Sequence, residues 1–375
     1  MIFDQPVYID SSNMLVDADV AITEADIKKL INWEVEVIET AGHEIKNIPL
    51  PQSQELPLNK KEIVAQYEDL LKRRKELVSI HRKAQMAISE VYNSIKSDKL
   101  FRLNKVESSV TDIINLLKQN QNVFLFLYGL DENKNYLITH SVNVAFYSIL
   151  LGMSLKYTAS QLIELGTGAI LVDAGMMKVP IYIINKQSKL SDQEYNLIKT
   201  HPLLGYKALT QLATVSNNIA DVSLQHHEQF DGKGYPRGLK GEEISELASI
   251  VSIADSYESQ ISNRIYKQKI YFHNAMKNLI SSGANKFNPR LLNSFLPSLS
   301  LYPIGSIVKL NDQRIGIVIG SSPDKPLRPV VKLIFDEKKK KIKDTVLINL
   351  IDKTDIYIIK ALEESEVQVN IFDFL

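Results

Sequence analysis

Residues 226–239 read HHEQFDGKGYPRGL, and this stretch decides how the rest of the chain is interpreted. Two adjacent histidines are followed by two acids, three glycines, a proline and an arginine. Three glycines and a proline cannot continue a helix, so residues 231–238 are expected to form a compact loop directly after the histidines. On this loop Tyr235 could stack on a nucleobase and Arg237 could hold a phosphate. The alternative is a plain turn that ends a helix.

The composition indicates an ordinary globular protein with more than one domain. Of 375 residues, 45% are apolar and 23% are charged, and Lys plus Arg equal Asp plus Glu at 44 each. This balance gives no argument for a nucleic-acid partner. The absence of cysteine excludes disulfides and thiolate metal ligands. Because the N-terminus does not resemble a signal peptide and no run approaches 18 uninterrupted apolar residues, we expect a cytoplasmic protein without a membrane partner.

The first third of the chain divides into three segments. Residues 1–45 combine strand-like runs at 6–9 and 34–39 with a helix-opening pattern between them, which predicts a small α+β domain. Three prolines mark 46–58 as a linker. Segment 59–122 lacks Pro and Gly and repeats its apolar residues at three- and four-residue steps, which predicts one long helix or two. This connector either forms a coiled-coil homodimer or packs against its own domain.

The remainder divides into a helical and a β-rich part. Residues 123–300 show helical periodicity, and Ser191 with Asp192 opens one helix in the manner of an N-cap. Residues 301–375 contain short β-rich runs separated by Gly, Pro, Asn and Asp, which predicts a small β subdomain. The four lysines at 338–341 are interpreted as a solvated hairpin turn rather than a nucleic-acid patch.

Four histidines of the helical part are candidate metal ligands: His140, His201, His226 and His227. A lone histidine is usually a core residue, but four in one domain, two of them adjacent, favour a metal site. Neighbouring residues on a helix point about 100° apart, so the adjacent pair is not expected to bind one ion without help. Asp173 and Asp255 add oxygen ligands. Imidazoles and carboxylates without sulfur suit Fe, Mn, Zn or Ni, and ions held in this way activate water for attack on phosphate esters.

The histidine stretch resembles the signature of the HD-GYP family of cyclic di-GMP phosphodiesterases. The other motifs of that family follow in order along the helical part. They are THSVNVA (139–145), LVDAGMMKVP (171–180) in place of HD-x-GK-xx-IP, HPLLGYKAL (201–209) and IADSYESQISNRIYK (253–267). The segment after 301, YPIGSIVKL, is similar to a tail often attached in this family. The resemblance implies a mainly α chain built around an all-helical HD-type metal-dependent domain.

The resemblance also implies roles for individual residues. Asp173 would bridge two ions, and Asp173 and His227 are the catalytic candidates. The implied metal ligands are His140, Asp173, His201, His226, His227 and Asp255. The implied substrate-binding residues are Asp231, Tyr235, Arg264 and Lys267, with Asp231 and Gly232 shaping the loop. The cofactor would be one or two transition-metal ions, Fe or Mn. The partners would be cyclic di-GMP and a protein that docks on the loop at 231–238, which we call the GYP loop.

Two departures from the family pattern bear on activity. Val172 stands where the family has the histidine of its HD pair, and Met176 stands where it has a lysine. Lys178 would point to another side of a helix and is not expected to substitute. Lesser departures are Glu258 for an Asp, Ile265 for a Pro, and Tyr136 where some relatives carry an acidic ligand for a third ion.

Three functions are compatible with these residues. The first, which we favour, is a metal-dependent phosphodiesterase with reduced turnover, because loss of a positioned cation costs on the order of 10²–10³ in rate by analogy with an oxyanion donor. The second is a relative that senses the dinucleotide, or docks a partner through the GYP loop, without cleavage. The third is a structural helical protein with incidental histidines. Metal content separates the third from the others, and turnover separates the first two.

Overall fold

The computed structural model divides the chain into two compact units, Met1–Pro57 and Leu58–Leu375. It describes residues 7–10, 13–16, 38–40, 60–120, 127, 136–186, 188–262, 272–283, 285–298, 302, 305–320, 328–342, 344–362 and 364–367. The described part is mainly helical and carries small antiparallel sheets, which confirms the predicted fold class.

The first unit contains a three-stranded antiparallel sheet in the order β2-β1-β3. Its strands are β1 (Val7–Asp10), β2 (Asn13–Val16) and β3 (Glu39–Thr40). Val7 on the central strand is fully buried and pairs with Val16 on one side and Thr40 on the other. The run at 6–9 is therefore a strand as predicted, whereas β2 was not expected. The helix predicted between the strands lies outside the described residues, as does most of the run at 34–39.

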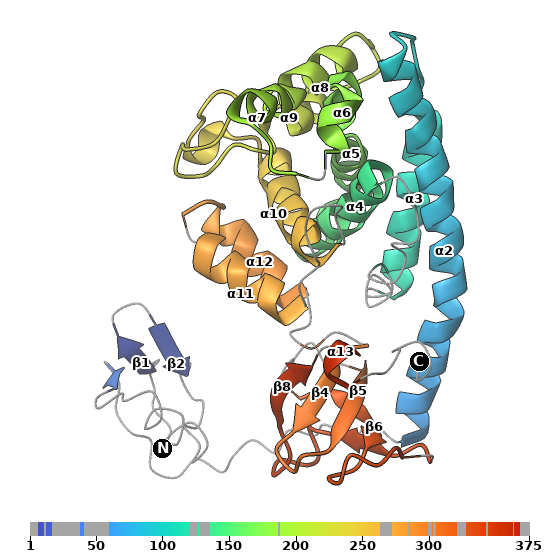
Figure 1. The fold of residues 1–375 in the computed structure, drawn as a ribbon, viewed down its shortest axis with the longest axis vertical. Helices are drawn as coiled ribbons and strands as arrows, with labels where there is room; N and C mark the ends of the chain where they lie inside the picture. Colours follow the sequence, from blue (N-terminus) through green and yellow to red (C-terminus); the bar gives the residue numbers. More distant parts are fainter. Residues whose placement is uncertain are drawn as a thin grey trace. The chain divides into compact units, whose positions relative to one another are not determined.

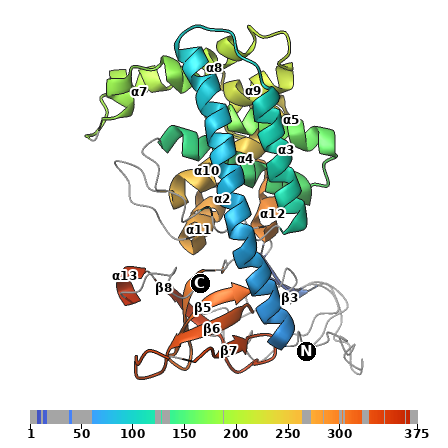
Figure 2. The same cartoon turned by 90° about the vertical axis from the view of Figure 1, so that its right-hand side faces the viewer.

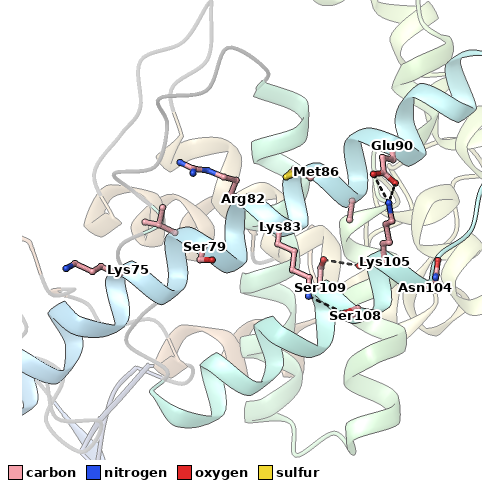
Figure 3. A pocket seen from close by; sticks show the side chains of 12 residues that line it. Lys75, Ser79, Arg82, Lys83, Met86, Glu90, Asn104, Lys105, Ser108 and Ser109 are labelled. Carbon is pink, nitrogen blue, oxygen red and sulfur yellow. Dashed lines mark hydrogen bonds and ion pairs between the residues drawn. The ribbon is translucent and has the colours of Figure 1, made fainter.

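The second unit begins with two long helices, α2 (Lys60–Lys96) and α3 (Asn104–Gln119), which pack side by side (Figure 2). From Leu77 onward, α2 buries one face in its own domain, and the buried positions recur at helical spacing: Leu77, Ala84, Ile88, Val91 and Ile95. A pocket lies between the two helices, with Met86 exposed at its rim (Figure 3). Of the two alternatives for this segment, packing against its own domain is therefore realised from Leu77 on.

Helix α4 (Tyr136–Ser154) is the central helix of the domain and packs against α5 (Ala159–Ile170) and α10 (Glu246–Ile261) (Figure 1). It is apolar all round, as expected of a helix enclosed by others. Among the described helices it alone is long and apolar enough to cross a membrane, but most of it is buried inside the domain, as in a core helix. Among the polar side chains that α4 nevertheless buries are His140 and Asn143.

The remaining helices surround this core. Ser191 caps α7 through the backbone N–H of Glu194, and the Glu194 side chain accepts from the Ser191 N–H, so the predicted N-cap is confirmed. The short elements are η2 (Ala174–Lys178), α6 (Ile181–Ile184), α7 (Asp192–Ile198), α8 (His201–Leu209), α9 (Asn217–Gln225), η3 (Gly241–Glu243), α11 (Phe272–Gly283) and α12 (Pro289–Ser298).

The C-terminal part is a five-stranded antiparallel sheet in the order β7-β6-β5-β4-β8, followed by α13 (Glu364–Val367). Four strands fall in the predicted runs, and a fifth, β8, was not expected. The strands are β4 (Ile307–Leu310), β5 (Ile315–Gly320), β6 (Val330–Phe335), β7 (Leu347–Asn349) and β8 (Ile358–Leu362). The lysine run forms the predicted turn, because the Asp336 carboxylate accepts from the backbone N–H groups of Lys338 and Lys340.

Candidate metal centre

A close backbone approach brings Asp173 next to His201. Asp173 precedes η2, and His201 begins α8. A Cβ atom on Gly175 would lie 1.9 Å from the backbone oxygen of His201 and 2.4 Å from the nitrogen of Gly205, so a side chain at 175 would force the two elements apart. With glycine there, Asp173 Oδ1 lies 3.3 Å from His201 Nε2.

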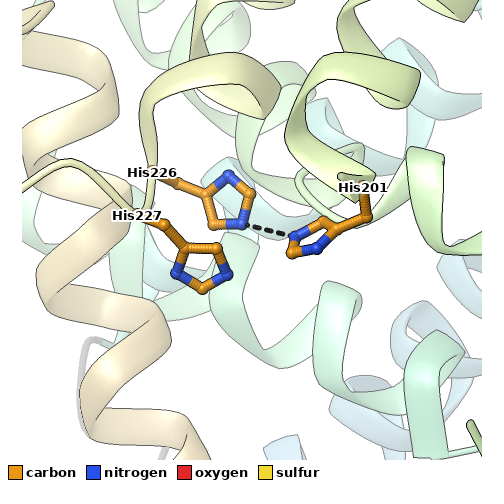
Figure 4. A group of neighbouring side chains, drawn as sticks. All are labelled: His201, His226 and His227. Carbon is orange, nitrogen blue, oxygen red and sulfur yellow. Dashed lines mark hydrogen bonds between the residues drawn. The ribbon is translucent and has the colours of Figure 1, made fainter. Parts of the chain in front are cut away.

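Three imidazoles converge on one point beside this carboxylate. Their donor atoms, from His201, His226 and His227, lie within 4.8 Å of one another (Figure 4). The expectation for the adjacent pair rested on a regular helix, and that premise does not hold here. Helix α9 ends at Gln225, so His226 and His227 lie in a turn rather than on a regular helix, and their ring centroids are only 4.0 Å apart.

The hydrogen bonds of His201 and His226 leave their Nε2 lone pairs aimed at each other. His201 Nδ1 lies 2.6 Å from the carbonyl of Ile198, and His226 Nδ1 lies 2.9 Å from the carbonyl of Ser223. Since a carbonyl only accepts, both Nδ1 atoms carry the proton, and neither Nε2 has one in the neutral ring. These two Nε2 atoms are 3.2 Å apart (dashed in Figure 4). Two buried acceptors with no donor between them fit a cation bound at this point.

The protonation states agree with this assignment. Burial lowers the pKa of His201 to about 4, and burial together with the neighbouring His201 lowers the pKa of His226 to about 4. Burial, followed by the charges of His226 and His201, lowers the pKa of His227 well below its usual value. All three rings are therefore neutral at pH 7, which is the state in which imidazole ligates a metal.

A second group of ligands lies on the other side of Asp173. His140 Nε2 is 3.0 Å from Asp255 Oδ1 and 3.6 Å from Asp173 Oδ2, while His140 Nδ1 donates to the Glu258 carboxylate. Burial opposes a charge on His140, but the carboxylates of Glu258 and Asp255 outweigh it and raise the pKa of His140 to about 10. A histidine whose outer nitrogen binds a carboxylate is a common arrangement behind metal ligands.

The six predicted ligands thus form two half-sites that share Asp173. We call His140, Asp173 and Asp255 the carboxylate half-site, and Asp173, His201, His226 and His227 the histidine half-site. Each offers only nitrogen and oxygen donors, a set that fits a divalent metal ion.

Within segment 170–180, the two positions that depart from the family pattern carry apolar side chains. Val172 is buried in the core, and Met176 packs with Val179 and Ile183. Lys178 pairs with Asp98 on the connection between α2 and α3, with its Nζ 2.5 Å from the Asp98 carboxylate. That Lys178 does not substitute for the lysine of the family pattern stays a prediction.

The buried side chain of Glu228 holds the GYP loop in place through hydrogen bonds. Its two carboxylate oxygens accept from the backbone N–H groups of Arg237 (2.7 Å) and Leu239 (3.1 Å). Gly234 makes this fold of the chain feasible, because a Cβ there would lie 2.4 Å from the Glu228 Cα. The loop places the ring of Tyr235 over His227, with centroids 4.8 Å apart.

Of the four predicted substrate residues, the structure describes Tyr235 and Asp231. Tyr235 lies at the centre. Asp231 binds within its own loop, since it accepts from the backbone N–H of Lys233 (3.0 Å) and lies 3.3 Å from the Lys233 ammonium. Arg264 and Lys267 lie outside the described residues.

The structure also brings to the centre residues that the sequence analysis left out. Lys199 Nζ lies 5.5 Å from the Tyr235 ring centroid and 4.7 Å from that of Tyr195. Burial lowers the pKa of Lys286, and the charge of Asp255 opposes that shift. Glu258 was noted only as a departure from the family pattern. No sequence signal marks the two lysines, because each reaches the centre only through the tertiary fold.

Comparisons with known proteins agree with this geometry. Residues 128–291 match the family model of the HD domain, and residues 307–370 match that of a KOW domain associated with the HD domain. Cyclic di-GMP phosphodiesterase PA4108 of Pseudomonas aeruginosa is 31% identical over 258 residues, which are 69% of this chain and 62% of that protein. Cyclic di-GMP phosphodiesterase PdeB of Borreliella burgdorferi is 27% identical over 307 residues, 81% of each chain. The solved structure of Bd1817, an HDG"Y"P protein from Bdellovibrio bacteriovorus, has the same fold, with a TM-score of 0.51 and 19% identity over 79% of this chain and 94% of that one.

Proposed function

Because the chain belongs to the HD-GYP family of HD-domain proteins, we propose that it binds cyclic di-GMP at this centre and hydrolyses it slowly. The observation that carries the proposal is the histidine half-site, in which all four donors converge directly beneath Tyr235 of the GYP loop. Two relatives that share this domain are named cyclic di-GMP phosphodiesterases, which supports the substrate.

The two half-sites would hold one or two divalent ions, for which we propose Fe or Mn. Mixed imidazole and carboxylate donors suit both metals. A bound ion supplies Lewis-acid activation of water and of the phosphoryl oxygen. Asp173 faces both half-sites and is the proposed bridge, while His227 is the ligand in contact with the loop that would hold the substrate.

The chain's own residues would bind and orient the dinucleotide. The Tyr235 ring offers a stacking surface for a base. Arg264 and Lys267 are proposed, from the sequence, to hold the phosphates. Lys199, whose ammonium lies beside the Tyr235 ring, supplies positive charge on the same side of the centre.

We attribute the slow turnover to the apolar side chains of Val172 and Met176. Val172 cannot ligate an ion, so the carboxylate half-site has one imidazole fewer than the family pattern. Met176 carries no charge for the phosphate. Loss of a single positioned donor costs on the order of 10²–10³ in rate, and here two groups are replaced.

The test is a hydrolysis assay on the purified chain loaded separately with Mn²⁺ and Fe²⁺, with products separated by chromatography. We expect product well below the ordinary enzyme range of about 1 s⁻¹ and above that of a His227→Ala control. Calorimetry with cyclic di-GMP on the same samples measures binding. Turnover of about 1 s⁻¹ or more would contradict the reduced rate, and absence of cyclic di-GMP binding by metal-loaded protein would contradict the substrate.

A non-catalytic sensor is the second candidate. It is favoured by the same two apolar side chains, Val172 and Met176, which replace a histidine and a lysine of the family pattern. In that case cyclic di-GMP binds with ordinary affinity but gives no product above the His227→Ala control. The GYP loop would then serve to dock a protein partner, because Arg237 and Gly238 at its tip are exposed.

The remaining predictions concern assembly and location. A homodimer through 59–122 stays a prediction. The surface of α2 and α3 that their own domain leaves open includes the pocket with Met86 at its rim (Figure 3). Light scattering of the purified chain measures the dimer directly. The cytoplasm likewise remains the location predicted from the sequence.

A further inference from the structure

A chain of buried polar side chains leads from α2 to the metal ligand candidate His140. His81 on α2 places its Nε2 2.9 Å from Asn143 Oδ1, and Asn143 Nδ2 donates to Glu258 Oε1 at 3.0 Å. The other Glu258 oxygen accepts from His140 Nδ1. All four side chains are at most 3% exposed. These hydrogen bonds thus link three helices, α2, α4 and α10, through side chains that are almost completely buried.

The donor and the acceptor can be assigned for each hydrogen bond in the series His81–Asn143–Glu258–His140. Glu258 is a carboxylate that accepts from His140, Ser262 and Asn143, so the Asn143 amide must point its NH₂ group at Glu258. Asn143 Oδ1 then faces His81 and requires a donor, which fixes the proton of His81 on Nε2. Burial lowers the pKa of His81, in agreement with a neutral ring. No member can rotate or change tautomer without loss of a buried hydrogen bond.

Two other contacts between α2 and α4 differ from this one. Gln85 Nε2 donates to Thr139 Oγ1 at 3.0 Å, and the Tyr92 hydroxyl lies 2.7 Å from Ser141 Oγ. Both fasten α2 to the turn of α4 that carries His140, and Ser141 Oγ in turn donates to the backbone carbonyl of Leu137. Burial and the charge of Asp173 raise the pKa of Tyr92, so its hydroxyl is neutral and its removal tests helix packing without removing a charge near the centre.

We propose that His81 is a positioning residue for the metal ligand His140, acting through Asn143 and Glu258. The inference rests on the proposed function insofar as His140 must bind an ion. The first unit ends at Pro57, and α2, which carries His81, is the first helix of the second unit.

The effect should appear in metal affinity, because an outer partner of a metal-bound histidine orients the ring and raises its basicity. Loss of such a partner weakens metal binding by about 10–100-fold. His81 is two links further out, so we expect about a 10-fold effect, the lower end of that range. In the histidine half-site, the rings of His201 and His226 bind to backbone carbonyls instead, so this half-site should change by less than about twofold.

The experiment is calorimetric titration of the full chain with Mn²⁺. The binding event that His140→Ala removes defines the carboxylate half-site. His81→Phe keeps a ring stacked beside Phe146 and removes only the donor, and it should weaken that event about 10-fold. His81→Gln, whose amide can still donate to Asn143, should restore affinity to within about threefold. Tyr92→Phe removes a buried hydrogen bond between the same two helices and should leave Mn²⁺ affinity unchanged.

Several results would overturn the inference. One is unchanged affinity of the His140 event in a folded His81→Phe variant. Another is an equal loss in His81→Phe and Tyr92→Phe, which would assign the effect to packing. If His81→Phe does not fold, Asn143→Ala interrupts the series of hydrogen bonds at its next residue. Unchanged Mn²⁺ affinity of the His140 event in that variant would likewise overturn the inference. If His140→Ala removes no event, His140 is not a ligand and the inference fails, while the proposed function stands as long as the histidine half-site and cyclic di-GMP binding persist.

Discussion

His140 and His201 both point Nε2 at Asp173, yet the fold holds them in opposite charge states. Two carboxylates outweigh burial and raise the pKa of His140 to about 10, so the metal-free protein carries an imidazolium there at pH 7. Burial lowers the pKa of His201 to about 4, so that ring is neutral. The difference comes from the groups around each ring: carboxylates of Glu258 and Asp255 lie at the two nitrogens of His140, whereas His201 Nδ1 donates to a backbone carbonyl.

This difference predicts that the two half-sites respond differently to pH. A cation must displace one proton from His140 at any pH below about 10, so Mn²⁺ affinity of the carboxylate half-site should rise about tenfold per pH unit from pH 7 to 9. The histidine half-site displaces no proton above about pH 4, so its affinity should stay within about threefold between pH 5.5 and 7. Calorimetry in two buffers of different ionisation enthalpy measures the protons released. Equal pH slopes for both events would contradict the assignment.

Val172 and Met176 can be tested by restoring the family's residues. Val172→His inserts a larger, polar group into a packed core, so it should lower the unfolding free energy of the metal-free protein by about 1–3 kcal/mol. Mn²⁺ should offset that loss by binding the new ligand. Val172→His with Met176→Lys should raise turnover on the order of 10²-fold, more than the product of the two single effects. Thermal unfolding with and without Mn²⁺, together with the hydrolysis assay, checks both parts. Independent, multiplicative effects would show that the two positions do not act on one step.

Among the elements, the GYP loop depends on one buried carboxylate. Glu228→Ala leaves the backbone N–H groups of Arg237 and Leu239 without their acceptor, at a cost of about 1–3 kcal/mol each. The loop should open, so trypsin should cut faster after the exposed Lys233, and cyclic di-GMP should bind more weakly as Tyr235 leaves His227. Glu228→Gln retains one acceptor oxygen and should lie between wild type and Glu228→Ala.

The control for this prediction is Glu242→Ala, at an exposed acid in the segment that follows the loop. It should change neither proteolysis nor affinity. If Glu228→Ala behaves in the same way as Glu242→Ala, the loop is held by other contacts and Glu228 has no positioning role.

The elements also show what sequence could and could not predict. The HD-GYP resemblance, confirmed by the family match, rests on local motifs, and those motifs contain all six ligand candidates that the fold brings together. The hydrogen bonds that lead from His81 to His140 join residues 62 to 118 positions apart, such as Asn143 and Glu258, which no local pattern connects. Strand β8 was missed because a short apolar run such as IIKAL fits a helix or a strand equally well by periodicity. The adjacent histidines were misjudged because the residue at which α9 ends decides where their rings point.

On the scale of the whole molecule, the candidate centre and the described core around it lie within the second unit, Leu58–Leu375. The α2 helix belongs to this unit, and its buried face from Leu77 on is part of the same core as α4 and α10. The first unit has a sheet of its own, with Val7 at its centre. The division therefore falls directly before α2, and this position makes a truncation informative.

We expect a fragment of residues 58–375 to fold and to keep the metal centre. The fragment retains every predicted ligand and the whole of α2, so its Mn²⁺ affinities should match those of the full chain to within about twofold. Circular dichroism, calorimetric titration and metal analysis after gel filtration measure these properties, with His227→Ala in the same fragment as the control that loses the histidine half-site. An insoluble fragment, or one that loses both binding events, would show that residues 1–57 are integral to the fold. Selective loss of the His140 event alone would instead show that the first unit sets the position of α2, and with it the geometry of the carboxylate half-site.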